Sequence, residues 1–213
     1  MLILTICYSK NIILFYFFIS FSVNNVCFIH IFINLNKLYL YLQKNTAKMN
    51  FKALATKGNK FLVSRYQTAD EIAAAIYKAI QESKPAADFL ATYFKAPTKK
   101  ESLKQIFTFC KNYIPYKAES EQNQTAKTIG RILSDATISG GDCKHYATFC
   151  GALAKALNIP VNLRLISQKP YDTTPNHIYA VAFLNGKEVI MDPVLDKFDT
   201  EARYNYKYDI KIN

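Results

Sequence analysis

A cysteine stands directly after two glycines and an aspartate, at the start of a long apolar helical pattern. The stretch is ISGGDCKHYATFCGALAKALNIP, residues 138–160. Gly140 and Gly141 can adopt backbone angles that other residues avoid, which allows a sharp entry, and Asp142 is a favoured N-cap that leaves Cys143 in the first turn. Unpaired amides and the helix dipole stabilise an anion there. Because the thiolate is the reactive form of cysteine, the spacing predicts that Cys143 is a nucleophile.

The other cysteines have simpler explanations. Cys150 lies seven residues after Cys143 inside the apolar stripe, and Cys110 lies on the apolar face of an earlier predicted helix. Both are expected to be small core residues. Cys7 and Cys27 complete a set of five without close pairing, which argues against a disulfide framework and leaves at least one free thiol.

A nucleophilic cysteine usually needs a base, and residues 49–213 contain two histidines, His145 and His177. His145 lies two residues from Cys143, and residues so spaced on a helix point to different sides. His177 opens a predicted strand and is therefore the expected base. Zinc is the competing use of these residue types, but Cys143, His145 and Cys150 match no familiar ligand spacing. No metal and no cofactor are expected.

A predicted hairpin relates His177 to a carboxylate. Asn and Gly at residues 185–186 lie between two alternating segments, a strong signal for a two-residue loop. The resulting register pairs Leu184 with Lys187 and makes Asp192 a diagonal neighbour of His177 on the same face of the sheet. A slip of one residue would place the two side chains on opposite faces.

Each of these residues also has an ordinary structural explanation. A first-turn cysteine can be incidental, a strand histidine is often half-buried, and an aspartate before proline commonly opens a turn. The cap chemistry, the exclusion of His145 and the hairpin register nevertheless agree. We therefore expect Cys143, His177 and Asp192 to form a catalytic triad in which Asp192 orients the imidazole.

The elements that position these residues are predicted in two blocks, helices first and strands afterwards. Thr68 followed by Glu71 has the spacing of a capping box ahead of one helix, and Pro85 is expected to end it. Residues 116–126 are polar and are expected to form a surface loop. Further helices fit residues 86–94 and 100–114, and strands fit residues 161–167, 177–183 and 187–192. This order indicates the α+β class, in a single domain over residues 49–213 with a helical lead-in over residues 49–115.

The first 48 residues form an apolar leader of different composition, without Gly, Pro, Asp, Glu, Arg or Trp. One interpretation is that translation starts at Met49, which would make the protein cytoplasmic. The alternatives are a signal peptide or a membrane helix over residues 12–33, in which Asn24 and Asn25 would lie at a cost in the bilayer. Residues 11–34 would then export or anchor the protein, and only then would a membrane be a partner.

The charge of the chain is moderately basic. The leader holds four of the 27 Lys and Arg residues and none of the 16 Asp and Glu residues, so the remainder is basic by seven charges. The lysines are scattered, which favours a solvated surface over a nucleic-acid interface. The tail YNYKYDIKIN could stack on bases, but a terminal strand or an ordered tail is preferred, and no nucleic acid is expected as a partner.

The motifs GGDCKHYATFCGALAKALNIP, VNLRLIS and NHIYAVAFLNGKEVIMDPV resemble the transglutaminase-like superfamily, relatives of papain-type thiol enzymes. The resemblance covers residues 105–194 and implies a papain-like core, with an antiparallel sheet packed on the helix that carries the nucleophile. It implies that Cys143 is the nucleophile, His177 the base and later the acid, and Asp192 the orienting carboxylate. Members transfer an acyl group from an amide through a thioester, as cross-linkers, deamidases or peptidases. Short forms of this kind resemble microbial or phage-encoded members.

The expected function is thus that of a cysteine peptidase-like or transglutaminase-like hydrolase or acyltransferase that acts on a peptide or protein. Hydrolysis is favoured because water needs no second binding site. The Cys143 amide is the expected oxyanion donor, while Gln122 and Gln124 are alternatives for a second one, since residues 49–213 contain no Trp. Substrate-binding residues are not identified, although the loop at residues 168–176 is expected to affect specificity. A catalytically silent binding or structural module of the same fold is the alternative.

Overall fold

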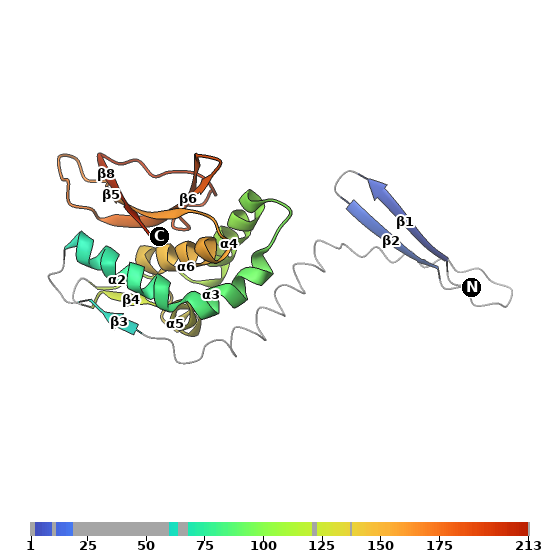
Figure 1. Cartoon of the computed structure of the whole chain (residues 1–213), viewed down its shortest axis with the longest axis horizontal. Coiled ribbons are helices and arrows are strands. Elements are labelled where there is room, and N and C mark those ends of the chain that lie inside the picture. Colours follow the sequence, from blue (N-terminus) through green and yellow to red (C-terminus); the bar gives the residue numbers. More distant parts are fainter. Residues whose placement is uncertain are drawn as a thin grey trace. The chain divides into compact units, whose positions relative to one another are not determined.

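The computed structural model describes residues 3–9, 12–18, 60–63, 68–120, 123–136 and 138–212. The chain divides into two compact units, Met1–Asn50 and Phe51–Asn213 (Figure 1). In the first unit, β1 (Ile3–Ser9) pairs antiparallel with β2 (Ile12–Phe18). The start of the membrane helix considered for residues 12–33 is therefore a strand, and residues 19–33 lie outside the described part of the chain. Among the described residues, no helix combines the length and the apolar character needed to cross a bilayer.

The helices of the second unit begin where the sequence places caps. The predicted capping box is confirmed: Thr68 and Glu71 exchange hydrogen bonds ahead of α2 (Ala69–Glu82). Pro85 does not end α2 but lies in the first turn of α3 (Lys84–Ala91), where a missing N–H costs nothing because first-turn amides have no partner within the helix. The short η1 (Thr92–Phe94) leads to α4 (Lys99–Tyr113), whose buried face includes Cys110.

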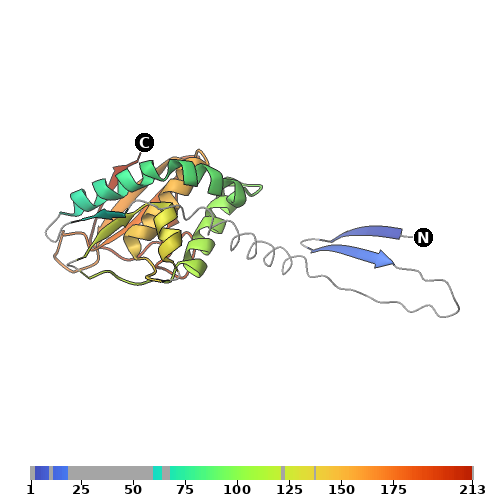
Figure 2. The same cartoon turned by 90° about the horizontal axis from the view of Figure 1, so that it is seen from below.

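A central helix, α6 (Cys143–Ala156), begins at the predicted nucleophile. Every residue from Lys144 to Ala154 is buried, as expected of a helix that is covered on all sides. It contacts β5 and β6 of the large sheet and, elsewhere, α2, α3, α4 and α5 (Ile129–Asp135). Figure 1 shows it between the large sheet and the helices, and Figure 2 shows the same elements from below. Two short strands, β3 (Lys60–Leu62) and β4 (Thr125–Lys127), form a separate antiparallel pair.

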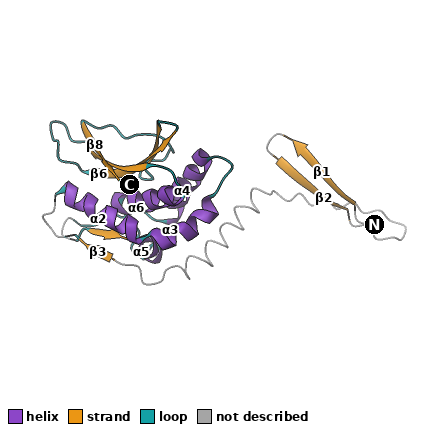
Figure 3. Cartoon of the chain, viewed as in Figure 1, coloured by secondary structure: helices purple, strands orange, loops and turns teal. Residues whose placement is uncertain are grey.

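The large sheet has the strand order β7-β6-β5-β8, and all of its neighbouring strands are antiparallel (Figure 3). Its members are β5 (Val161–Ser167), β6 (His177–Leu184), β7 (Lys187–Met191) and β8 (Tyr206–Lys211). The predicted hairpin register is confirmed, since Leu184 pairs with Lys187. Asn185 and Gly186 have φ values of 51° and 76°, the left-handed pair that a type I′ turn requires.

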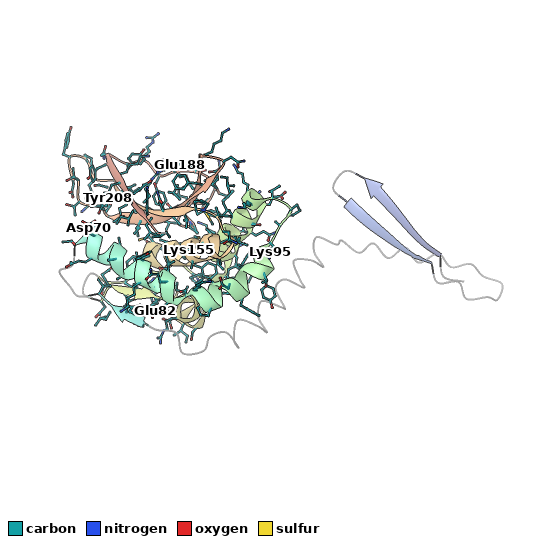
Figure 4. All side chains as sticks on the ribbon, viewed as in Figure 1. Asp70, Glu82, Lys95, Lys155, Glu188 and Tyr208 are labelled. Atoms are coloured by element: carbon teal, nitrogen blue, oxygen red, sulfur yellow. The ribbon has the colours of Figure 1, made fainter. Side chains whose placement is uncertain are left out.

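The C-terminal tail is an ordered edge strand, as preferred from the sequence. Tyr208 on β8 donates a 2.7 Å hydrogen bond from its hydroxyl to Asp70 at the start of α2, and the two labelled side chains lie side by side in Figure 4. The helices and the antiparallel sheets expected of an α+β domain are both present, and the sheet brings His177 to the end of β5, near Ser167.

Candidate active site

The entry into α6 is fixed by the segment that follows α4. Gly140 has φ 63°, and a Cβ built on it would lie 2.3 Å from the Pro115 carbonyl oxygen, so a side chain is excluded there. Gly141 donates its N–H to the Pro115 carbonyl at 3.0 Å, and its own carbonyl accepts from the Lys117 N–H at 2.9 Å. These bonds hold Tyr116 beside Gly141, two residues before Cys143.

Asp142 caps the helix as predicted. Its Oδ1 accepts the Lys144 N–H at 3.2 Å, and the His145 ring completes a capping box by accepting from the Asp142 N–H. Hydrogen bonds and charge from His145 and Lys144 outweigh the effect of burial and hold the pKa of Asp142 well below its usual range. Cys143 is therefore the first helical residue, and it is half-buried, whereas Cys110 and Cys150 are fully buried.

The predicted contact between His177 and Asp192 is present. Nε2 of His177 lies 2.7 Å from Oδ2 of Asp192, while Oδ1 of the same carboxylate accepts the Val194 N–H at 3.2 Å. The carboxylate is nearly inaccessible to solvent. Because Nε2 is engaged, Nδ1 is the ring nitrogen left to face the thiol of Cys143.

Charge in this group favours a protonated imidazole. Burial disfavours the imidazolium, but hydrogen bonds to Asp192 and Cys143 and the charges on both residues outweigh it and raise the pKa of His177 to about 9. Asp192 and Cys143 thus both act on a single imidazole and favour its charged form.

His145 and the two buried thiols lie outside this arrangement. The His145 ring is wholly buried and engaged with Asp142 and Thr125, which agrees with its exclusion as the base. Cys110 and Cys150 are core residues, as predicted. Burial, followed by a hydrogen bond to Cys150, raises the pKa of Cys110 well above its usual value.

Tyr116 is a site residue that the sequence did not identify. Its ring lies edge-on to Tyr146 with centroids 5.8 Å apart, and 53% of the residue is exposed. Burial of the phenol and the negative charges of Cys143, Asp142 and Asp192 raise the pKa of Tyr116, so the phenol keeps its proton at neutral pH. No spacing rule could have identified it, because the parallel bridge to Gly141 is a tertiary contact.

Of the two glutamines considered as oxyanion donors, Gln124 is bound elsewhere. Gln124 uses its side-chain amide to bond the carbonyls of Glu119 and Ser120, at 3.3 and 3.0 Å, and Gln122 lies outside the described residues. Within the part of the chain that the structure describes, no group of three or more His, Cys, Asp or Glu side chains could hold a metal ion.

No protein-family model matches the sequence, and no curated protein matches it. A candidate cysteine protease from Cytophaga hutchinsonii is similar in structure at 17% identity and TM-score 0.35, over 68% of this chain and 42% of that chain. The Rad4–Rad23 complex bound to a 6-4 photoproduct UV lesion is similar at 13% identity and TM-score 0.29, over 74% of this chain and 38% of that chain. The chain thus spans less than half the length of either. At these TM-scores neither likeness bears on the chemistry, for which the geometry of the chain itself is the guide.

Proposed function

We propose that the protein is a thiol-dependent amide hydrolase or acyltransferase, with Cys143 as nucleophile, His177 as base and acid, and Asp192 as the residue that orients His177. The proposal depends chiefly on one imidazole: it is hydrogen-bonded to a buried carboxylate at 2.7 Å, and its pKa is raised by that carboxylate and by the thiol at the N-terminus of α6. A protein with a purely structural role has no need of this combination.

The reaction would proceed in two halves. The Cys143 thiolate attacks the amide carbonyl and forms the S–C bond of a tetrahedral intermediate. The imidazolium of His177 then gives its proton to the amide nitrogen, the C–N bond breaks, and an amine or ammonia leaves a thioester. Neutral His177 next takes a proton from water, which attacks the thioester, and the S–C bond breaks to restore the thiolate and release the acid.

Two donors are suitably located for the oxyanion of each intermediate. The first is the Cys143 N–H, because first-turn amides have no partner within the helix. The second is the Tyr116 phenol, which remains protonated because its pKa is raised beside Cys143 and Asp192. The phenol would serve as the second oxyanion donor, which cannot be an indole because residues 49–213 contain no Trp.

The arrangement supports the resemblance to the transglutaminase-like superfamily. A cysteine begins the central helix α6, while His177 opens β6 and Asp192 follows β7, so the chain order is Cys, His, Asp. The expected substrate is a peptide or protein amide. Water is favoured as the acceptor because the residues named above supply no second binding site for an amine.

A generic acyl donor tests this proposal without knowledge of the substrate. We expect the full chain to release a burst of p-nitrophenolate from p-nitrophenyl acetate and to carry a transient acetyl group on Cys143, located by peptide mass mapping. Cys143→Ala should abolish the burst, whereas the matched control Cys150→Ala, on the same helix, should retain it. Acetylation that spreads evenly over the thiols, or no acetyl-thiol at all, would refute the proposal. Added hydroxylamine then distinguishes an enzyme that admits amines from one restricted to water.

A further inference from the structure

We propose that His145 is a positioning residue for Cys143, in that its buried ring locks the first turn of α6 to a buried charge network that also holds the segment carrying Tyr116. The inference rests on the proposed function and deepens it. His145 was excluded as the base by its place on the helix, yet it is completely buried, and a buried imidazole must have hydrogen-bond partners.

Both ring nitrogens of His145 have partners. Nδ1 lies 3.0 Å from both the amide nitrogen and the Oδ1 of Asp142. The Asp142 amide donates to Nδ1. Nε2 lies 3.3 Å from the Thr125 hydroxyl, which in turn bonds Oε1 of Glu119. The contacts thus run from the Asp142 amide through His145 and Thr125 to Glu119.

Ion pairs surround the ring. We use the name buried charge network for the charged side chains beneath the start of α6, namely Glu119, Asp135 and Asp142 with Lys127 and Lys144. Lys127 lies 3.5 Å from Glu119 and 3.1 Å from Asp135, and Lys144 bonds Asp142. Arg131, whose side chain is 40% exposed, pairs with Asp135 at the edge of the network. These pairs link the start of α6 to β4 and to Glu119.

This network joins the two segments that carry the proposed oxyanion donors. Glu119 accepts the Thr125 N–H at 2.6 Å, and its own N–H points to Oδ2 of Asp142 at 3.5 Å. A Cβ on Gly141 would lie only 3.0 Å from Cβ of His145, so the ring also fills the space inside the glycine turn. The backbone angles of Asp142 determine where the Cys143 N–H points, and His145 holds those angles by satisfying the buried Asp142 N–H.

Two reactions at the same sulfur separate positioning from folding. Acetylation by p-nitrophenyl acetate forms an S–C bond through a tetrahedral oxyanion and expels p-nitrophenolate, so it uses the amide donor. Alkylation by iodoacetamide forms an S–C bond as the C–I bond breaks and iodide leaves, without an oxyanion. Both rates are measured at Cys143 in the full chain by peptide mass mapping.

The informative variants are His145→Leu, which removes the acceptor, and His145→Asn, whose Oδ1 can stand where Nδ1 stands. We expect His145→Leu to slow acetylation by about 10–100-fold and alkylation by less than about 3-fold, and His145→Asn to restore acetylation to within about 3-fold of the parent. Equal losses in both reactions, or none, would overturn the inference.

If His145→Leu does not fold, Thr125→Val provides the same test, because it removes the hydroxyl that contacts Nε2 of His145. It should slow acetylation about 3-fold or more while alkylation stays unchanged, and parallel changes would again contradict positioning. Absence of acetylation at Cys143 in the parent chain rejects the proposed function itself. Normal acetylation in the parent without a selective loss in any variant rejects only the role of His145.

Discussion

Two groups at the large sheet combine a cation with carboxylate partners, but the two cations differ in how many of their N–H donors are bound. The first, the Arg164 cluster, consists of Arg164 on β5 with Glu188, Glu201 and Asp209. The second is the candidate site of Cys143, His177 and Asp192. Tyr179 lies between them, since its hydroxyl donates to Glu201 at 2.7 Å and its ring lies 5.5 Å from that of His177.

In the Arg164 cluster, every N–H donor of the guanidinium is hydrogen-bonded. The guanidinium, 2% exposed, makes two bonds to Asp209 at 2.7 and 2.8 Å, two to Glu188 at 2.8 and 2.7 Å, and one to Glu201 at 2.7 Å. Hydrogen bonds to Asp209 and Glu188 hold the pKa of Arg164 above its usual range despite burial. Because Arg164 stays protonated and all of its N–H donors are bound, its role is to link β5 to the neighbouring segments.

The cation of the candidate site, His177, has fewer carboxylate partners than Arg164. His177 has one carboxylate partner on Nε2. Despite burial, Asp192 and Cys143 raise the pKa of His177 to about 9, so the ring holds its proton at neutral pH. The two groups therefore differ in the cation: Arg164 stays protonated and is bound through five N–H···O bonds, whereas His177 can titrate and has one carboxylate partner.

Asp192→Asn should give the largest change, a loss of about 10³-fold in acetylation of Cys143. The amide keeps the shape but removes the charge that favours the imidazolium, so the pKa of His177 should fall below about 9. NMR titration of the ring measures the pKa directly, and the burst assay measures the rate. An unchanged pKa in the variant would mean that Asp192 does not determine the charge on His177.

Arg164→Met is the matched change in the other group and should affect stability instead. Removing the cation leaves Glu188, Glu201 and Asp209 without their partner. Because these carboxylates are 26–44% exposed, we expect a loss of only about 3 kcal/mol in the free energy of unfolding, the low end for a broken buried ion pair. Urea denaturation measures it. The alkylation rate of Cys143 in the folded variant should stay within about 2-fold of the parent, and a specific loss of thiol reactivity would contradict the separation of the two groups.

The free energy of unfolding should depend on pH through the titration of His177, whereas Arg164 should not contribute to this dependence. The folded-state pKa of His177 is raised from 6.5 to about 9, so its contribution is fully present below about pH 6.5 and is lost as the pH rises through about 9. The difference corresponds to up to about 3 kcal/mol. Urea denaturation of the parent and of His177→Ala between pH 6 and 10 isolates it, and equal slopes in the two proteins would argue against the raised pKa.

Tyr116→Phe should have the smallest effect of the set, about 10-fold on acetylation. The change removes one phenolic donor and keeps the ring against Tyr146, so alkylation by iodoacetamide should not change. Tyr113→Phe is the matched control, on a partly exposed residue of α4 with its ring stacked on Phe109. Equal behaviour of the two variants would remove Tyr116 from the proposed oxyanion site.

Local rules explain what the sequence could predict. Caps identified the start of α2 and the position of Cys143 on α6, and a two-residue hairpin fixed the register that brings Asp192 to His177. Tyr116 and the buried charge network could not be predicted, because they depend on how residues 115–127 pack against α6. Lys127 and Lys144 look like surface residues in sequence and are buried only because carboxylates from other elements surround them. Pro85 was misassigned because proline both ends and begins helices.

The most direct test of the central claim is the rate at which iodoacetamide alkylates each cysteine of the full chain between pH 5 and 9, in the parent and in His177→Ala. Cys110 and Cys150 are internal references for buried thiols. A thiolate–imidazolium pair predicts that, at about pH 6, Cys143 is alkylated faster than Cys110 and Cys150. It also predicts that Cys143 loses this advantage in His177→Ala. If Cys143 instead reacts as slowly as the two buried thiols, or equally fast in His177→Ala, the pair does not exist and the proposed chemistry is wrong.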